Sequence, residues 1–351
     1  MRHARVHARH DPTMSARVVR RVEMRYAAGA DPTVDRPAHV RAASGIAWVG
    51  ATLAVIQDDA NFIALVDPTT GLAESVALPR GPGGRRLFDD GRGNKAEKTD
   101  HEAVTVIATG DGPLLVALGS GSTRVRESIA MVAGLDQRRA AVRSVVVPRL
   151  YAGLRECTSF AGSQLNVEGA IFVDGRLRLF GRGNGAVLGD VHPVNATCEL
   201  EWAALRAHIE DPDQVPPPVA FDVVQYALGS IDNSALSFTD ATTGWESGNA
   251  ATTVLYSAAA EASPDATRDG DVVGSAIGVI AERSGETTAR WTELQDRDGR
   301  RLALKAEGIV VDRHAPDRLL VVVDVDSHDE PSDLLDVRLE GSWPTTAARS
   351  A

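Results

Sequence analysis

The sequence predicts an all-β fold, a five-bladed β-propeller closed by an N-terminal strand. Five short segments share one pattern, in which Ser or Glu is followed by Gly or Ala and then by an alternating apolar run. They are SGIAW from Ser44, EAVTV from Glu102, EGAIF from Glu168, SALSF from Ser234 and EGIVV from Glu307. After a few turn residues, a second apolar strand follows each segment: LAVI, LLVAL, LRLF, TVLY and LLVVV. Such a repeat, roughly 50–70 residues long, is typical of a radial array of small sheets.

Four of the predicted blades, which begin near residues 44, 101, 167 and 233, contain enough strand-like segments for a complete sheet. In the first, FIALVD from Phe62 and AESVAL from Ala73 follow the two inner strands. In the second these places are taken by ESIAMVAG and VRSVVVP, and in the fourth by VGSAIGVIA and ARWTELQD. The third has VAFDVVQYAL as its outer strand and, before it, a stretch around residues 195–205 that is strand-like or helical.

The fifth blade, which begins near residue 306, is one strand short. It offers only EGIVV, LLVVV and LLDVRLEG, whereas VVRRVEMRY from Val18 is a strand-like segment without a blade of its own. Pairing the segment 18–26 into the last blade closes the ring and removes an exposed sheet edge. We therefore expect one propeller domain over residues 15–345, preceded by a disordered leader over residues 1–14, with Met14 as a possible alternative start.

Composition restricts the class of protein and of partner. No stretch reaches the ~20 apolar residues that a membrane-spanning helix needs, and the N-terminal segment lacks the apolar core of a secretory signal. The formal charge of −11 disfavours nucleic acid and anionic membranes as partners. Cys157 and Cys198 are too few for a disulfide framework. We expect a cytoplasmic protein that acts on a small molecule, with its oligomeric state undetermined.

The repeat itself predicts a metal site. In a propeller the first strand of each blade lines the central channel, so equivalent positions on five such strands form a ring. Ordinary solvated polar residues at strand ends would account for one glutamate, but three converging carboxylates cost energy unless a cation or protons neutralise them. A ring of carboxylate and hydroxyl oxygens suits Ca²⁺ better than zinc or Mg²⁺. The predicted ligands are Ser44, Glu102, Glu168, Ser234 and Glu307.

These motifs resemble those of the calcium-activated nucleotidases, or soluble apyrases, which are five-bladed propellers with one central Ca²⁺. The similar strings are KAEGIVV, HEAVTV, VEGAIF and NSALSF, together with QDDANF from Gln57. Some also occur in phytase-like propellers, to which the resemblance is weaker. In the nucleotidase family, loops at the channel mouth hold the nucleotide. The resemblance implies catalytic roles for Arg182 on phosphate and for the acidic pair Asp58 and Asp59, but Ala60 stands where the family has arginine.

The loops that follow the second strands supply the remaining candidates. His101 is either a general base or a hydrogen-bonded structural histidine. We predict substrate contacts from polar side chains on the same face: Asn61, Ser120, Arg124, Asn184, Glu261 and Asp324. The Gly-rich, charged segment 80–100 is either a solvated loop or a phosphate-gripping lid that carries Arg85, Arg86, Lys95 and Lys98.

Three functions fit this sequence. The first is a Ca²⁺-dependent hydrolase of a phosphate-containing small molecule, in which the ion and Arg182 neutralise charge on the phosphoryl group. The second is a hydrolase of another small ester or lactone. The third is a non-catalytic binding propeller with a structural calcium. The fold alone does not choose among them.

Overall fold

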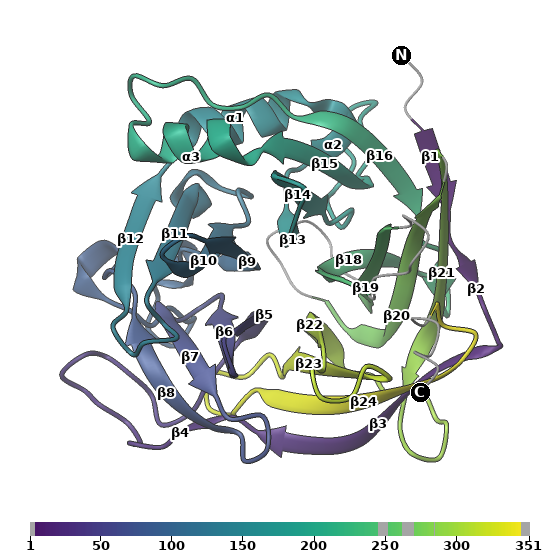
Figure 1. Ribbon diagram of the computed structural model, residues 1–351, viewed down its shortest axis with the longest axis horizontal. Coiled ribbons are helices and arrows are strands. Elements are labelled where there is room, and N and C mark those ends of the chain that lie inside the picture. Colours follow the sequence, from purple (N-terminus) through teal and green to yellow (C-terminus); the bar gives the residue numbers. More distant parts are fainter. Residues whose placement is uncertain (1–3, 245–251, 262–269, 284, 345–351) are drawn as a thin grey trace.

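The computed structural model describes residues 4–244, 252–261, 270–283 and 285–344. It is a β-propeller, so the predicted all-β class is confirmed, and its strands form groups around a central axis (Figure 1). Strand pairing gives four sheets, and the ten-stranded one divides at a short parallel pairing, so we number five groups of strands as blades 1 to 5 in the order of their innermost strands.

Each blade is an antiparallel sheet of four main strands. Blade 1 contains β5 (Ala43–Val49), β6 (Thr52–Gln57), β7 (Phe62–Val66) and β8 (Leu72–Ala77). Blade 2 contains β9 (His101–Thr109), β10 (Gly112–Gly119), β11 (Ser128–Ala133) and β12 (Ala141–Val146). Blade 3 contains β13 (Val167–Val173), β14 (Arg176–Gly181), β15 (Asn195–Glu201) and β16 (Phe221–Ala227).

The last two blades are joined. Blade 4 contains β18 (Ser234–Thr243), β19 (Thr252–Glu261), β20 (Val272–Arg283) and β21 (Glu286–Gln295), with the short β17 (Ser230–Ile231) on the inner side. Blade 5 contains β22 (Lys305–Val311), β23 (Arg318–Asp324), β24 (Asp333–Gly341) and β3 (Met14–Glu23). Because β3 pairs antiparallel with β24 along its length, the N-terminal segment completes this blade as the sequence predicted. β3 also makes a short parallel pairing with β21.

The innermost strands contact one another in a closed circle, in the order β5, β9, β13, β18, β22 and back to β5. The core lies between neighbouring blades, where their apolar faces pack as in a sandwich of sheets. Between blades 5 and 1, for example, Leu320 and Val322 pack with Leu53 and Val55. Alternation along each strand places these side chains on the buried faces.

Residues 4–10 form two short strands, whereas the sequence predicted a disordered leader over residues 1–14. β1 (Ala4–His7) pairs with β16 of blade 3, and β2 (Arg9–His10) pairs with β21 of blade 4. After β3, the two-residue β4 (Arg25–Tyr26) pairs with β8 of blade 1. Residues 4–26 thus run around the outside of the propeller and cover the outer strands of four blades in succession (Figure 1). This pairing satisfies backbone groups that edge strands would otherwise expose.

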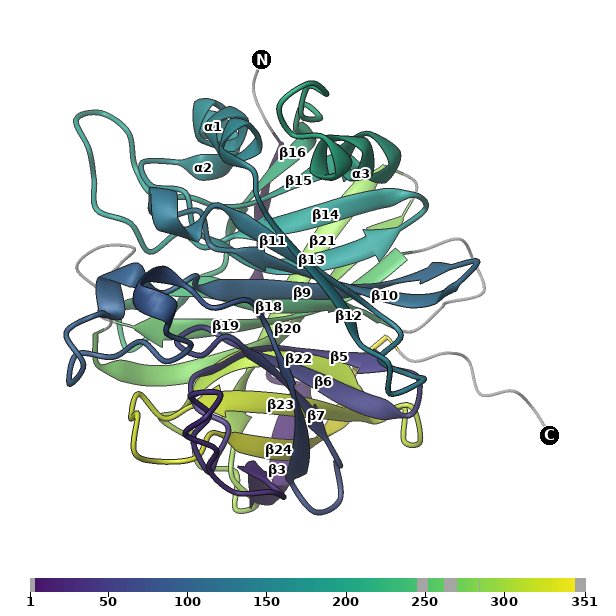
Figure 2. The ribbon, with the colours of Figure 1, turned by 90° about the vertical axis from the view of Figure 1, so that its left-hand side faces the viewer.

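The described residues contain three α-helices, which lie on the outside near blades 2 and 3 (Figure 2). They are α1 (Pro148–Glu156), α2 (Thr158–Ala161) and α3 (Trp202–Glu210). The first two were not predicted, although Pro148 at the first turn is a recognised start signal. The ambiguous stretch 195–205 divides into β15 and the beginning of α3. None of the helices in the described residues is long and apolar enough to cross a membrane.

Candidate metal centre in the central channel

The five innermost strands share a β-bulge, which lies near the N-terminal end of four of them and in the middle of β18. In each, one residue is skipped in the pairing with the second strand, which re-aims its side chain. The skipped residues are Ser44, Glu102, Glu168, Thr239 and Glu307. Four of these five are predicted ring members, so the repeated motif marks a repeated backbone irregularity.

The predicted blade 4 member, Ser234, does not occupy the equivalent position. It lies five residues earlier, at the start of β18, where it pairs with Ile231 of β17. Thr239 takes the place instead, and its contacts match those of Ser44. The Ser44 hydroxyl donates to the carbonyl oxygen of the residue before Glu102 (2.6 Å), and the Thr239 hydroxyl donates to that of the residue before Glu307 (2.5 Å). The motif comparison selected Ser234 because SALSF matches the repeated pattern. The structurally equivalent segment begins with Thr239 and Asp240.

The small residue after each bulge has a steric role. A Cβ atom built on Gly308 would lie 2.9 Å from the Cα of Gly45, and one on Gly169 would lie 3.2 Å from the Cα of Asp240. Neighbouring inner strands therefore approach closely at this level, which we call the waist of the channel. Gly45, Ala103, Gly169 and Gly308 meet this requirement. Asp240 replaces the small residue in blade 4, and its carboxylate accepts the backbone N–H of Ile309 (2.9 Å).

Above the waist lies a small, strongly charged space, the acidic cavity. Its volume is about 30 Å³, close to the share of one water molecule in the liquid. Six carboxylate side chains line it: Asp58, Asp100, Glu102, Glu168, Glu307 and Asp324. Four cationic side chains join them: Lys98, Arg126, Arg182 and Lys305. When all are ionised, the cavity has an excess of two negative charges.

Most of these charges are paired. The Lys98 ammonium lies 2.5 Å from a carboxylate oxygen of Asp58 and 2.6 Å from one of Asp100. Arg126 also pairs with Asp100, at 2.9 Å. On the opposite side, Arg182 pairs with Glu168 at 3.4 Å, and Lys305 pairs with Glu307 at 2.9 Å. These buried pairs connect the side chains that converge on the channel from different blades.

Several carboxylate oxygens nevertheless have no hydrogen-bond donor among the described residues. They include Oδ1 of Asp58 and Oε2 of Glu307, both buried. The half-buried Glu102 carboxylate makes no hydrogen bond or ion pair with any other described residue. Asp58, Asp100 and Glu102 each offer an oxygen within 4.8 Å of the others. An acidic triad that could hold a metal ion is therefore present, with Asp100 buried and the other two half-buried, and its all-oxygen donor set suits a hard cation.

The protonation equilibria show the same excess of negative charge. Burial raises the pKa of Glu168 to about 8, although Arg182 opposes this shift. Burial and the neighbouring charges of Asp100, Glu168 and Asp58 raise the pKa of Glu102 well above its usual range. Burial likewise raises the pKa of Asp324. Without a further cation, protons must therefore neutralise part of the cluster near neutral pH.

A larger hollow, the acidic cleft, adjoins the cavity on the same face. Its volume is about 410 Å³, and it shares Asp58, Lys98 and Asp324 with the acidic cavity. Its other acidic residues are Asp59, Asp89, Asp90, Asp271 and Asp326, against Lys95 as the additional cation. This cleft is the space through which a ligand would approach the carboxylate triad.

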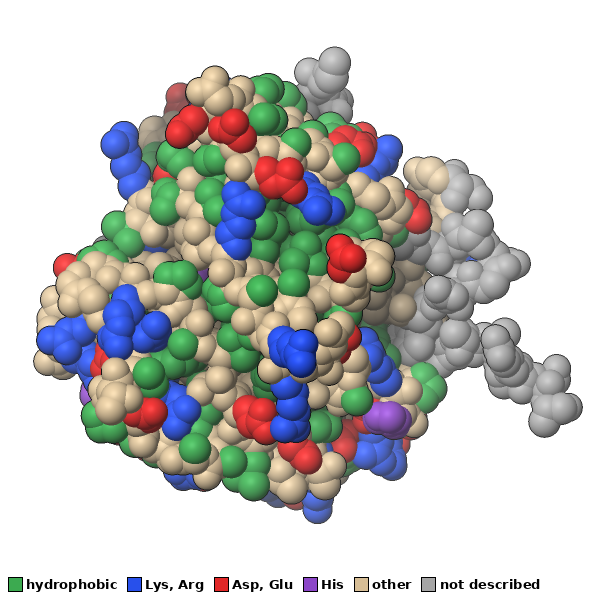
Figure 3. All heavy atoms as spheres, turned by 60° about the vertical axis from the view of Figure 1, so that its left-hand side comes forward, with side chains coloured by type: hydrophobic (Ala, Val, Ile, Leu, Met, Phe, Trp, Pro, Cys, Tyr) green, Lys and Arg blue, Asp and Glu red, His purple; other side chains and the backbone are tan. Residues whose placement is uncertain are grey.

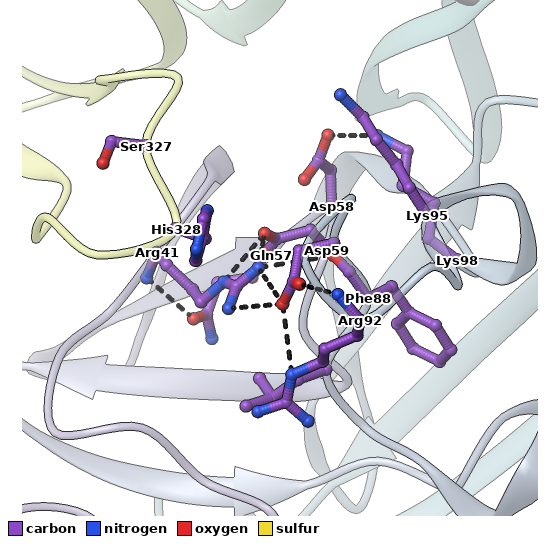
Figure 4. Close-up of polar contacts among 12 residues, drawn as sticks. Arg41, Gln57, Asp58, Asp59, Phe88, Arg92, Lys95, Lys98, Ser327 and His328 are labelled. Atoms are coloured by element: carbon purple, nitrogen blue, oxygen red, sulfur yellow. Dashed lines mark hydrogen bonds and ion pairs between the residues drawn. The ribbon is translucent and has the colours of Figure 1, made fainter.

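Asp59 belongs to the wall of this cleft rather than to the cavity. It pairs with the buried Arg41, which also lies 3.3 Å from Asp89. Figure 4 shows Arg41 and Asp59 pointing toward each other, beside Gln57 and Phe88. Burial and the adjacent Asp58 raise the pKa of Asp59 to about 6. The acidic pair predicted as catalytic is thus divided between two networks, one around Lys98 and one around Arg41.

Three other predicted residues have structural contacts. His101 is buried, and burial lowers its pKa to about 4, so the imidazole is neutral near pH 7. Its side chain does not line the cavity, which fits the structural interpretation better than the general base. Asn61 is bonded on both sides, to the carbonyl of Pro79 and to the Thr99 hydroxyl. The buried Ser120 hydroxyl donates a hydrogen bond to the Asp100 carboxylate and so helps to hold this member of the triad in place.

The remaining candidates differ in position. Asn184 and Asp324 line the acidic cavity, and Glu261 reaches its edge through an ion pair with Arg182 at 2.5 Å. Arg182 is thus held between two carboxylates instead of facing an open phosphate site. Arg124 is exposed and does not line the cavity, whereas Arg126, two residues later, does.

Sequence reasoning missed several members of the cluster as site residues: Asp100, Arg126, Asn166 and Lys305, along with Thr239. Lys305 had a detectable signal, because residues two apart on a strand share a face and it precedes Glu307 by two. The sequence predicted a role for Lys98 only within a phosphate-gripping lid, whereas this residue lines the acidic cavity. The segment 80–100 instead folds back as an ordered loop that buries Phe88, Lys98 and Asp100.

Comparisons with known proteins place the chain in a family but do not assign an activity. No curated protein matches it. Among solved structures, glutaminyl cyclase of Myxococcus xanthus is similar at 10% identity, over 97% of this chain and 99% of that one, with a TM-score of 0.44. The GH93 α-L-arabinofuranosidase of Fusarium graminearum, solved with arabinobiose, is similar at 9% identity, over 93% and 98%, with a TM-score of 0.38. A family model matches residues 39–339, so the chain belongs to a family of unknown function, DUF6929.

Proposed function

We propose that this protein binds a divalent cation, Ca²⁺, in the acidic cavity. The excess of two negative charges among the lining side chains carries the proposal, because one divalent ion would neutralise it. The unpartnered oxygens of Asp58 and Glu307 and the unpaired Glu102 are the available ligands. Ca²⁺ accepts six to eight oxygens in irregular arrangements, whereas Mg²⁺ demands a regular octahedron.

The protein's own cations compete with this ion. Lys98 and Lys305 lie among the carboxylates, so an incoming ion would take over some of their pairings. This competition predicts an affinity well below that of a dedicated buffer site.

We further propose that the ion supports hydrolysis of a phosphate-containing small molecule in the acidic cleft. A bound divalent cation polarises a phosphoryl oxygen and offsets its charge. The resemblance of the inner-strand motifs to calcium-activated nucleotidases supports this reaction class. Because the cleft is acidic, it would repel a phosphate group unless the metal were bound. Asp58 and Asp324 line the cleft, where their carboxylates could accept hydrogen bonds from a water molecule beside the metal.

A structural ion is the second candidate, and the ion pairs that cross the channel favour it. Lys98 approaches along the loop before blade 2 and pairs with Asp58 of blade 1, and Arg182 of blade 3 pairs with Glu261 of blade 4. An ion at their centre would fasten the blades together whether or not any substrate binds.

Thermal unfolding of chelator-treated protein, with and without millimolar Ca²⁺ or Mg²⁺, tests the binding proposal. A ligand present at ~100 times its dissociation constant adds roughly 2.7 kcal/mol to the free energy of unfolding. We expect a calcium-selective rise that is lost in Glu102→Gln and kept in Glu97→Gln, an exposed matched control. Absence of a shift, together with absence of metal from the untreated protein, would refute the site.

Release of phosphate from a panel of nucleotides and sugar phosphates then separates the two candidates. Calcium-dependent turnover that disappears in Asp324→Asn would support the hydrolase. A calcium-stabilised protein without turnover on any member of the panel would favour the structural ion.

A further inference from the structure

The channel has a second cavity on the other side of the waist, the apolar cavity. Its volume is about 610 Å³, within the range of ligand pockets in proteins, which is roughly 300–1,000 Å³. All five innermost strands contribute apolar side chains to its lining, among them Ile46, Trp48, Val104, Phe172, Ala241 and Val310, and four threonines line it as well. Its lining includes residues at the turns between the innermost and second strands, among them Gly50, Thr109 and Gly112.

The charge of this cavity differs from that of the acidic end. None of the described residues that line it is acidic, and the single lining cation is Arg313. The Arg313 guanidinium lies over the Trp48 ring, 5.1 Å from its centroid, and donates to the carbonyl of Gly50. Within the described part of the chain, no carboxylate lies within ion-pair distance of it. The space-filling view shows hydrophobic side chains exposed between charged ones on the surface that it presents (Figure 3).

We propose that the apolar cavity binds a small amphipathic anion, with its hydrocarbon or aromatic body between the five strands and its anionic head at Arg313. Transfer of the ligand's hydrocarbon or aromatic body from water to the apolar walls would contribute roughly 25 cal/mol of binding free energy per Å² of apolar surface buried. The exposed guanidinium, already oriented by Trp48 and Gly50, supplies a donor fork that matches a carboxylate or sulfonate. The waist separates this ligand from the acidic cavity, and the two sites share no lining residue.

Three probes of equal chain length test both parts of the proposal: octanoate, octanol and octyltrimethylammonium. Isothermal titration and equilibrium dialysis of the full chain should show one saturable site for octanoate. We expect octanoate to bind more tightly than octanol by roughly twofold to fivefold, the range that a partly exposed charge pair supplies. The cationic probe should bind most weakly.

Two variants locate the site. Ala108 lines the cavity but is exposed, so Ala108→Trp should fill the mouth and abolish octanoate binding while the protein unfolds at the parental temperature. Arg313→Gln should remove the preference for octanoate over octanol, and Arg300→Gln, on the loop between β21 and β22, should keep it. Failure of all three probes to saturate, retention of octanoate binding in Ala108→Trp, or a preference for the cationic probe would overturn the proposal. Since none of these residues lines the acidic cavity, the outcome does not depend on calcium binding.

Discussion

The two ends of the channel are built by the same five strands, but their chemistry is opposite. Glu102 and Val104 lie two residues apart on β9, as do Glu168 and Ala170 on β13. The first member of each pair lines the acidic cavity and the second lines the apolar cavity. The side chains that line the channel therefore change from carboxylate to apolar over two residues of each of these strands.

The difference shows what the waist contributes. Close approach of the inner strands at Gly45 and Gly308 marks the level between the two cavities, which share no lining residue. The carboxylates of the acidic end lie in a small, largely buried space. That burial raises the pKa values of Glu102 and Glu168.

The largest contrast between the ends should appear when an arginine is replaced at each. Arg41 is 3% exposed and pairs with two carboxylates of the acidic cleft, whereas Arg313 is exposed at the apolar mouth. Arg41→Leu leaves these carboxylates without their partner and should lower the free energy of unfolding by about 3–5 kcal/mol. Arg313→Leu should change it by less than about 0.5 kcal/mol. Urea unfolding measures both, and equal effects would contradict this contrast.

The pH dependence of stability should report the acidic end. The pKa of Glu168 in the folded protein, about 8, lies above its value of 4.5 in an unfolded chain. The native state therefore holds a proton that the unfolded state has released between these values, and stability must fall as the pH rises from about 5 to 8. For the metal-free protein we expect a loss on the order of 3 kcal/mol, after allowance for coupled neighbours.

The same measurement has two internal checks. Glu168→Gln cannot titrate and should flatten this part of the stability curve. Calcium should flatten it as well, because a bound ion favours the ionised carboxylate. A parental curve that is level from pH 5 to 8 without metal would show that the cluster is neutralised by its own lysines and arginines alone.

The waist can be tested through its glycines. Gly308→Ala would place a methyl group 2.7 Å from a Val322 methyl and 2.9 Å from the Gly45 Cα, so we expect a loss of about 1–3 kcal/mol from overpacking. Gly110, in the hairpin between β9 and β10, has no atom within 4 Å of its built Cβ. Gly110→Ala is therefore the matched control, and comparable losses in the two variants would show that the waist is not tightly packed.

The smallest expected effect separates the two candidates for the blade 4 ring position. Thr239→Val removes hydrogen bonds to the Ala306 carbonyl and the Ser257 hydroxyl and should cost about 1–2 kcal/mol. Ser234→Ala should be nearly neutral in stability and in calcium affinity. If the Ser234 variant lost calcium binding while the Thr239 variant kept it, the structural equivalence of Thr239 and Ser44 would have no functional meaning.

Much of the architecture followed from local sequence. Alternating apolar runs separated by turn residues predicted the inner two strands of every blade, because strand periodicity and turn chemistry are local properties. The strand-like segment from Val18, which had no blade of its own, predicted closure of the last blade. Four of the five bulged residues were also identified, since Ser or Glu before Gly or Ala recurs at the level where the strands converge.

Tertiary structure decided the rest. The pairing register of β18 distinguished Thr239 from Ser234. Short motifs alone could not do so, because both residues fit an alternating strand pattern. The folded chain also placed Lys98, Asp100 and Arg126 beside Glu102, and residues 4–10 against blades 3 and 4. The charge of a site is a sum over side chains that converge from separate blades. The sequence determined the repeat and its carboxylates, and only the folded ring decided which cations share their cavity.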